Sequence, residues 1–164
     1  MYNENMSEEP VLNAPKKDYD APMHTTEHIL NRTMDTMFGC GRAFSAHVET
    51  KKSKCDYHFA ADTVPDAAAL AAVESKVNEV ISQNLPVTSK VVSREEAAAL
   101  VDLSRLPEDA SEMLRLVYVG DYDVCPCIGK HVENTSEIAE IGTFRIISSD
   151  WNDGVFRLRW RVTK

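Results

Sequence analysis

Near its end the chain alternates apolar and polar residues with a period of two: Phe156, Arg157, Leu158, Arg159, Trp160, Arg161, Val162 and Thr163. Successive side chains of a β-strand point to opposite faces of the sheet, so this pattern indicates a half-buried strand. One face of that strand is apolar and the other carries three arginines. The chain must therefore contain a sheet that buries one face and exposes the other.

Two stretches have the composition and spacing of long helices. From Met23 to Phe38 the apolar side chains form a helical stripe, and Gly39-Cys40-Gly41 then ends the helix. Ala67 to Gln83 is rich in Ala, Leu and Val, and Pro65 marks the start of this second helix. Both helices are long enough to cover one face of a sheet.

Shorter apolar stretches predict further strands at residues 42–48, 54–60, 87–92, 114–119, 122–125 and 141–148. Ser93-Arg-Glu-Glu96 is a capping-box pattern that opens a short helix through Leu100. The strands follow one another mostly in hairpin order. We therefore predict an α+β fold in which two long helices pack on a mainly antiparallel sheet.

The chain has 164 residues, which is enough for one domain with its own hydrophobic core. Residues 1–22 carry three prolines, several acids and few apolar side chains, so we expect a flexible N-terminal arm. Residues 23–164 then form a single domain. No apolar run approaches membrane-spanning length and no secretory signal is visible, so we expect a cytoplasmic location.

The formal net charge of −8 argues against a general nucleic-acid coat protein, whose affinity comes from cations on phosphates. It leaves room for a protein that contacts one end of a folded RNA. The candidate contacts lie at a predicted hairpin turn and on one face of the last strand: Lys51, Lys52, Lys54, Arg157, Arg159 and Arg161. A solvated polar face is the alternative interpretation of the same residues.

Two histidines and a later cysteine–histidine pair could bind one metal ion. His24 and His28 are four residues apart on the first helix, so both reach the same point beside it. Cys127 and His131 enclose three residues directly after a predicted strand. Three imidazole nitrogens and one thiolate form a ligand set that suits zinc.

Each of these residues also has a simpler interpretation. The two helix histidines could be solvated, and Cys127 could be a small buried apolar residue. Cys125 could replace Cys127 as a ligand or pair with it in redox chemistry, although disulfides are unexpected in a reducing compartment. The metalloprotease motif HExxH does not apply, because Thr25 stands where the glutamate would follow the first histidine.

The order of these motifs resembles a known family. The stretch HTTEH, residues 24–28, followed by CIGKHVENTSEIAEIGTFRI from Cys127 onwards, resembles the editing domain of alanyl-tRNA synthetases and the free-standing AlaX trans-editing proteins. The editing domain of threonyl-tRNA synthetase has the same paired spacing. The segment NLPVTSKVVSREEA, residues 84–97, is similar to the middle segment of these domains. The resemblance covers about residues 23–164 and is greatest to the short AlaX type.

The resemblance implies a function and a set of site residues. His24, His28, Cys127 and His131 would hold Zn²⁺ and serve as the catalytic residues of an aminoacyl-tRNA deacylase. The reaction would be hydrolysis of the ester that joins a wrong amino acid, serine or glycine, to alanine tRNA. Ser45 falls where the family has a threonine that reads the hydroxyl of the substrate side chain. Thr25 and Thr26 are two further hydroxyl-bearing candidates for substrate binding.

The chain departs from the family pattern in three places. Ile128, Gly129 and Lys130 replace a segment that usually has two glycines, and Ala139-Glu140 looks inserted. Glu27 stands where small or apolar residues are common. These departures concern substrate choice more than metal binding, because the four ligand positions are intact.

Several functional alternatives follow from the same residues. With four protein ligands a zinc ion is coordinatively closed, whereas a catalytic ion keeps an open position. The protein could therefore be a zinc hydrolase of another small ester or amide, or a binding module with a structural metal. The sequence also leaves open whether the protein is a monomer or a homodimer.

Overall fold

The computed structural model describes residues 20–103 and 112–164. Nearly all of the predicted arm, residues 1–19, lies outside the described residues. The described part is an α+β fold with two antiparallel sheets, which confirms the predicted class. None of its helices has the length and apolar character needed to cross a membrane.

The larger sheet has four strands in the order β2-β3-β8-β7. The strands are β2 (Ser45–His47), β3 (Ser53–His58), β7 (Thr143–Asn152) and β8 (Val155–Thr163). Cys55, Tyr57 and Trp160 are fully buried on one face of this sheet, as the alternating pattern predicted for β8. The opposite face carries the arginines of β8.

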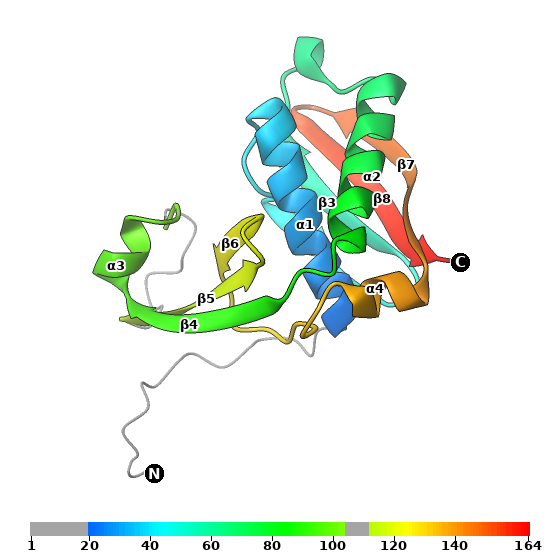
Figure 1. The fold of residues 1–164 in the computed structure, drawn as a ribbon. Coiled ribbons are helices and arrows are strands. Elements are labelled where there is room, and N and C mark those ends of the chain that lie inside the picture. The colour runs from blue at the N-terminus through cyan, green and yellow to red at the C-terminus, as the bar shows by residue number, and fades with distance from the viewer. Residues whose placement is uncertain (1–19, 104–111) are drawn as a thin grey trace, which may run out of the picture.

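Two helices lie side by side on the apolar face of this sheet (Figure 1). Helix α1 (Ala21–Phe38) begins two residues before the predicted start, and helix α2 is Ala67–Ser82. Asp20 caps α1 by accepting a hydrogen bond from the Met23 amide at 3.1 Å, which fixes the first turn that carries His24. The core lies between these helices and the sheet.

The smaller sheet has the order β4-β5-β6 and projects from the body beside α1 (Figure 1). Its strands are β4 (Val87–Ser93), β5 (Met113–Val119) and β6 (Asp123–Pro126). The predicted capping box at Ser93 is present and opens helix α3 (Arg94–Ala98). The predicted antiparallel pairing is present, but the prediction of a single sheet is wrong, because the strands form two separate antiparallel sheets.

Residues 136–141 form helix α4 (Ser136–Ile141), where the sequence predicted no helix and began a strand at Ile141. The buried hydroxyl of Thr135 anchors this helix, since it donates to the Ile81 carbonyl and accepts from the Leu85 amide, both at 2.9 Å. Gly142 is the C-cap of this helix, and only glycine fits there, because a Cβ atom would lie 2.3 Å from the backbone of Thr163. Strand β7 therefore begins only after this glycine.

Other boundaries differ in smaller ways. The 3-10 helix η1 (Ala61–Thr63) was not predicted, and β2 is much shorter than the predicted strand 42–48. Asp66 is the N-cap of α2, so Pro65 lies just outside the helix. At the other end of the chain, β7 extends to Asn152 and pairs with β8 through a turn at Asp153-Gly154.

Candidate metal centre

The first two turns of α1 place two imidazoles on one side of the helix. His24 and His28 are 3% and 4% exposed, and their ring centroids lie 5.0 Å apart. Both lie in the first half of α1, on the part of the helix next to the loop that follows β6. A buried imidazole favours a partner for each ring nitrogen, and Nδ1 of His28 has no hydrogen-bond partner among the described residues.

The loop after β6 is held by its own backbone contacts. The Cys127 amide donates to the Arg115 carbonyl at 3.0 Å, which continues the β5–β6 pairing by one step. The Arg115 guanidinium donates from Nη1 to the carbonyls of Cys127 at 3.2 Å and Gly129 at 2.8 Å. This arginine therefore fixes the turn that presents Cys127 and His131 to α1.

The four predicted ligand residues converge. His24, His28, Cys127 and His131 each offer a ligand atom, and these atoms all lie within 4.8 Å of one another. The Cys127 Sγ is 3.4 Å from His24 Nε2, and the ring of His131 stacks on that of His24 with centroids 4.2 Å apart. In the described residues Cys125 does not belong to this cluster.

The donor set fits a zinc ion. Three imidazoles and one thiolate within this span match the ligands and the coordination number of a tetrahedral zinc site. Nε2 of His131 is buried and has no hydrogen-bond partner among the described residues. An unpartnered buried nitrogen is costly, so an ion at this point would satisfy it.

Backbone and side-chain contacts set the orientation of two of the rings. Nδ1 of His24 donates to the Lys130 carbonyl at 2.9 Å, which directs its Nε2 at the cluster. Nδ1 of His131 lies 2.9 Å from the Thr25 hydroxyl, which also accepts from the Val132 amide at 3.2 Å. With Nε2 of His131 on a metal, its Nδ1–H would donate to that hydroxyl.

The third ring is oriented by a buried carboxylate. Nδ1 of His28 lies 3.6 Å from Oδ2 of Asp123, whose side chain is fully buried. Arg32 donates to Oδ1 of Asp123 at 2.9 Å, and Arg42 donates to both oxygens at 2.8 and 3.1 Å. Two guanidinium groups therefore hold the carboxylate against the imidazole, as in the carboxylate–histidine pairs of zinc sites.

These contacts shift the protonation of the cluster in the absence of metal. Burial would raise the pKa of Cys127, but the neighbouring imidazoles of His131, His24 and His28 lower it to about 3. Burial would lower the pKa of His28, but Asp123 and the Cys127 thiolate raise it to about 9. Burial lowers the pKa of His131 to about 4. The site therefore contains a thiolate and a neutral His131 at pH 7.

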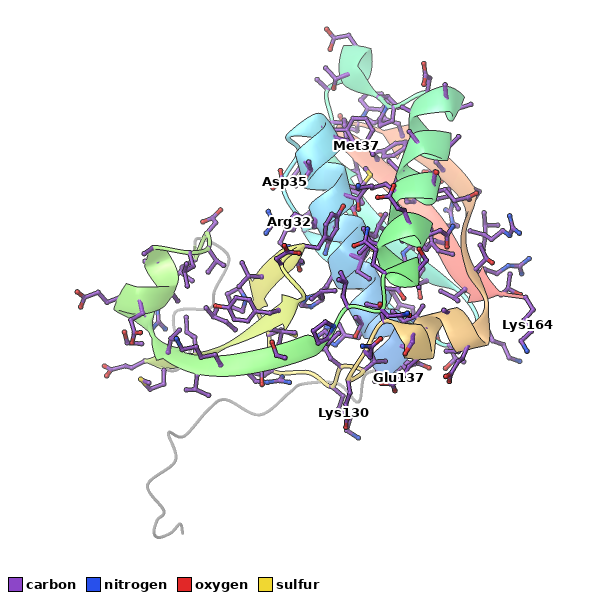
Figure 2. The ribbon with its side chains drawn as sticks, viewed as in Figure 1. Arg32, Asp35, Met37, Lys130, Glu137 and Lys164 are labelled. Atoms are coloured by element: carbon purple, nitrogen blue, oxygen red, sulfur yellow. The ribbon has the colours of Figure 1, made fainter. Side chains whose placement is uncertain are left out.

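A cavity of about 460 Å³ adjoins the cluster, and His28 lines it. Its walls come from α1, from the loop after α1, from the segment after α3 and from β6. Figure 2 shows Arg32 and Asp35, which also line the cavity, on the side of α1 that faces the smaller sheet. The candidate metal site thus borders a space between α1 and the smaller sheet, with both polar and apolar groups in its walls.

Comparisons with known proteins agree with this arrangement. Residues 114–159, which include Cys127 and His131, match the family described as the threonyl and alanyl tRNA synthetase second additional domain. The chain is 33% identical over 126 residues to the alanine–tRNA ligase of Oceanobacillus iheyensis, a match that covers 76% of this chain and 14% of that protein. It is 34% identical over 144 residues to the alanine–tRNA ligase of Shouchella clausii. This match covers 86% of this chain and 16% of that protein.

The chain belongs to the editing-domain family related to alanyl-tRNA synthetase. It spans about one seventh of the length of the relatives named above. The matched residues include the loop and strands that build half of the metal cluster. The resemblance recognised from the motifs is therefore confirmed at the level of the family.

This editing-domain chain does not bring Ser45 to the cluster. Ser45 pairs directly with Asp56, and directly paired residues of antiparallel strands share a face of the sheet. Asp56 lies between the core residues Cys55 and Tyr57, so it and Ser45 lie on the face opposite α1. The assignment of Ser45 as a substrate-binding residue stays a prediction, and its side chain lies on the face of the sheet away from the cluster.

The two threonines of the HTTEH motif are fully buried, and their hydroxyls have structural partners. Thr25 contacts His131 and Val132, so it supports a ligand instead of facing a substrate. The Thr26 hydroxyl donates to the Pro22 carbonyl at 2.8 Å within the first helical turns. The assignment of both as substrate-binding residues stays a prediction, and in this structure both hydroxyls have partners within the protein.

The predicted RNA-contacting residues gather on and beside the outer face of the larger sheet. Lys54 pairs with Arg159 on this face, and Arg157 donates to the neighbouring Asp56 at 2.8 and 2.9 Å. Arg159 donates to Asp150 at 2.7 Å, whereas Arg161 is exposed. Lys51 and Lys52 are exposed in the turn between β2 and β3.

Three residues of the site gave no signal in the sequence. Asp123, Arg32 and Arg42 come from β6, α1 and the loop after α1, and they meet only in the folded protein. Arg32 lies on the helix one turn after His28, which is a weak hint of a common face. No spacing rule links Asp123 to either arginine.

Proposed function

We propose that this protein is a zinc-dependent aminoacyl-tRNA deacylase that hydrolyses mischarged Ser- or Gly-tRNA(Ala). The convergence of His24, His28, Cys127 and His131 beside a cavity is the observation that carries this proposal. The family relationship supports a tRNA-linked substrate. An activated ester needs only a positioned water and stabilisation of the developing oxyanion.

The residues of the cluster would hold the metal and orient it toward the cavity. A bound Zn²⁺ would supply Lewis-acid stabilisation of charge on the ester oxygen. Thr25, Asp123 and the Lys130 carbonyl keep the three imidazoles in fixed orientations, which limits the motion of the ligands. The cavity next to His28 would accept the aminoacyl group and exclude most of the bulk water.

Polar groups in the cavity wall support selection of a hydroxyl-bearing amino acid. An apolar pocket rejects an added hydroxyl poorly, whereas a site that hydrogen-bonds the hydroxyl discriminates strongly against the analogue that lacks it. Asn31 lines the cavity, and its Oδ1 already accepts from Tyr57 and from the Ala43 amide. These bonds fix the amide group at the cavity wall, where its NH₂ group can serve as a donor.

The basic outer face of the larger sheet is the proposed tRNA contact. The chain has a net charge of −8, yet this face collects Lys54, Arg157, Arg159 and Arg161, with Lys51 and Lys52 at its edge. Phosphates bind such a cluster through release of counterions. Arg157 and Arg159 are bonded to acids, so Arg161 and the three lysines would carry most of the attraction.

The closed ligand set also favours a second candidate function, a binding module with a structural metal ion. Four protein ligands leave no open position on a tetrahedral zinc ion, which is the pattern of structural sites. A binding module with a structural metal would keep the same four residues and show no turnover. A zinc hydrolase of another small ester would cleave free aminoacyl esters as fast as charged tRNA.

One experiment separates these functions. The protein with measured zinc content is offered tRNAs charged with serine, glycine, threonine and alanine, together with the free methyl esters of these amino acids. We expect fast release of serine or glycine from tRNA(Ala), and slow cleavage of alanyl-tRNA and of the free esters. Cys127→Ser should lose zinc and turnover, whereas the matched variant Cys40→Ser, at another cysteine that does not line the cavity, should retain both. Full turnover by a zinc-free protein would refute the metal role, and absence of turnover with zinc bound would favour the structural candidate.

A further inference from the structure

We propose that Glu27 binds the α-ammonium group of the aminoacyl ester and restricts the site to esters of α-amino acids. This inference rests on the proposed deacylase function and names a substrate-binding residue for it. Glu27 lies between the two histidines of α1 in the sequence, and its carboxylate brings a negative charge beside the candidate ligand atoms.

The position of Glu27 places its carboxylate beside the ligand atoms. Oε1 of Glu27 lies 4.0 Å from Nε2 of His24, the nitrogen that is 3.4 Å from Cys127 Sγ. Glu27 also lines the cavity that His28 lines. The side chain is 14% exposed, so the carboxylate is largely withdrawn from solvent but borders an open space.

The other charged groups around the cavity have partners. Arg32 and Arg42 both donate to Asp123, and Asp35 accepts from the Gly41 amide at 2.9 Å. Glu27 faces His24 at 4.0 Å and attracts Arg42 at longer range, but no hydrogen bond to its carboxylate is found in the ranges 20–103 and 112–164. A largely buried carboxylate with free acceptor sites favours a small cation as its partner.

The proposed substrate carries one cation at a matching distance. In an aminoacyl ester the α-ammonium nitrogen is two bonds from the carbonyl carbon, or about 2.5 Å away. A carboxylate within about 4 Å of a candidate ligand atom could therefore bind the ammonium group while the ester carbonyl lies beside the cluster. Esters of hydroxy acids or fatty acids lack this cation and would leave the carboxylate unpaired, which is costly.

The test combines a change in the protein with a change in the substrate. Wild type and Glu27→Gln are compared on glycyl-tRNA and on glycolyl-tRNA, in which a hydroxyl replaces the ammonium group; seryl- and glyceryl-tRNA form a second pair. We expect kcat/KM of the wild type to be about 10- to 100-fold higher for the amino acid than for the hydroxy acid. In Glu27→Gln this preference should fall to within about threefold, with the zinc content unchanged.

Glu140→Gln is the matched control, because it removes the same charge from an exposed position on α4 and should keep the preference. Equal slowing of both esters by Glu27→Gln, or loss of zinc, would overturn the inference and leave the deacylase function standing. A wild type without preference between the two esters would also overturn it. If the wild type cleaves neither ester in either pair, the proposed function fails and the inference fails with it.

Discussion

The hydroxyl of Thr25 lies 2.9 Å from Nδ1 of His131, a residue 106 positions later in the chain. Thr25 follows His24 directly, so one turn of α1 supplies both a ligand and the group that orients another ligand. The hydroxyl also accepts from the Val132 amide, which ties the loop to the helix. Metal binding and docking of the loop therefore depend on the same side chain.

Thr25→Val should weaken zinc binding without unfolding the domain. Valine has nearly the same shape but leaves Nδ1 of His131 and the Val132 amide without a partner. Loss of such an orienting contact typically lowers metal affinity about 10- to 100-fold. Competition with a chromophoric chelator measures this change. Thr26→Val is the control, because the Thr26 hydroxyl bonds only within its helix; an equal loss of affinity in both variants would contradict the role of Thr25.

Asp123→Asn should destabilise the fold by about 3 kcal/mol, because two guanidinium groups and His28 lose a buried carboxylate. Burial would raise the pKa of Asp123, but His28 and Arg42 hold it well below its usual range. A lowered pKa in the folded state contributes stability above the unfolded value of about 4, and that contribution is lost as the pH falls below it.

Urea unfolding between pH 3 and pH 7 measures both effects. The free energy of unfolding should fall more steeply below pH 4 in the wild type than in Asp123→Asn. Asp150→Asn removes an exposed partner of Arg159 and should change stability by less than about 0.5 kcal/mol. Similar losses in the two variants would show that the Asp123 network adds nothing beyond a surface pair.

Zinc binding at pH 7 should release a proton from His28. The pKa of His28 is raised to about 9 in the metal-free cluster, so this ring is protonated at pH 7 and must lose its proton to become a ligand. Cys127, with a pKa lowered to about 3, is already a thiolate and releases none. The apparent zinc affinity should therefore rise about tenfold per pH unit toward pH 9.

Calorimetry in buffers with different ionisation enthalpies counts the released protons. Asp123→Asn removes a group that raises the pKa of His28, so it should release fewer protons at pH 7 than the wild type. Equal proton release by the two proteins would contradict the assignment of this proton to His28.

The sequence predicted the parts of the site that depend on local spacing. His24 and His28 are one helical turn apart, and Cys127 and His131 lie in one short loop, so each pair could be recognised in isolation. The contacts of Asp123 could not be recognised from the sequence, because they depend on how β6 packs against α1. Short-range patterns carry no information about that packing.

The face of a strand was harder to predict than its existence. Spacing from His24 assigned Ser45 to the substrate site, but the side chains of a strand alternate between faces, and the register with β3 directs Ser45 away from α1. The alternating pattern in β8 correctly predicted which of its residues are buried. It did not indicate which strands pair with β8. The division into two sheets therefore emerged only from the pairing.

Arg161→Gln should weaken tRNA binding and reduce its salt dependence. Arg161 is exposed on the basic face of the larger sheet, where it pairs with Arg145 across β7 and β8. Removal of one phosphate contact should lower the slope of log Kd against log salt by about 1. Filter binding of tRNA(Ala) between 50 and 200 mM salt measures this slope. The Debye length falls about twofold over this range. Lys90→Gln, at an exposed position on β4 of the other sheet, removes the same charge and should leave the slope unchanged; equal effects of the two variants would indicate diffuse attraction without a defined face.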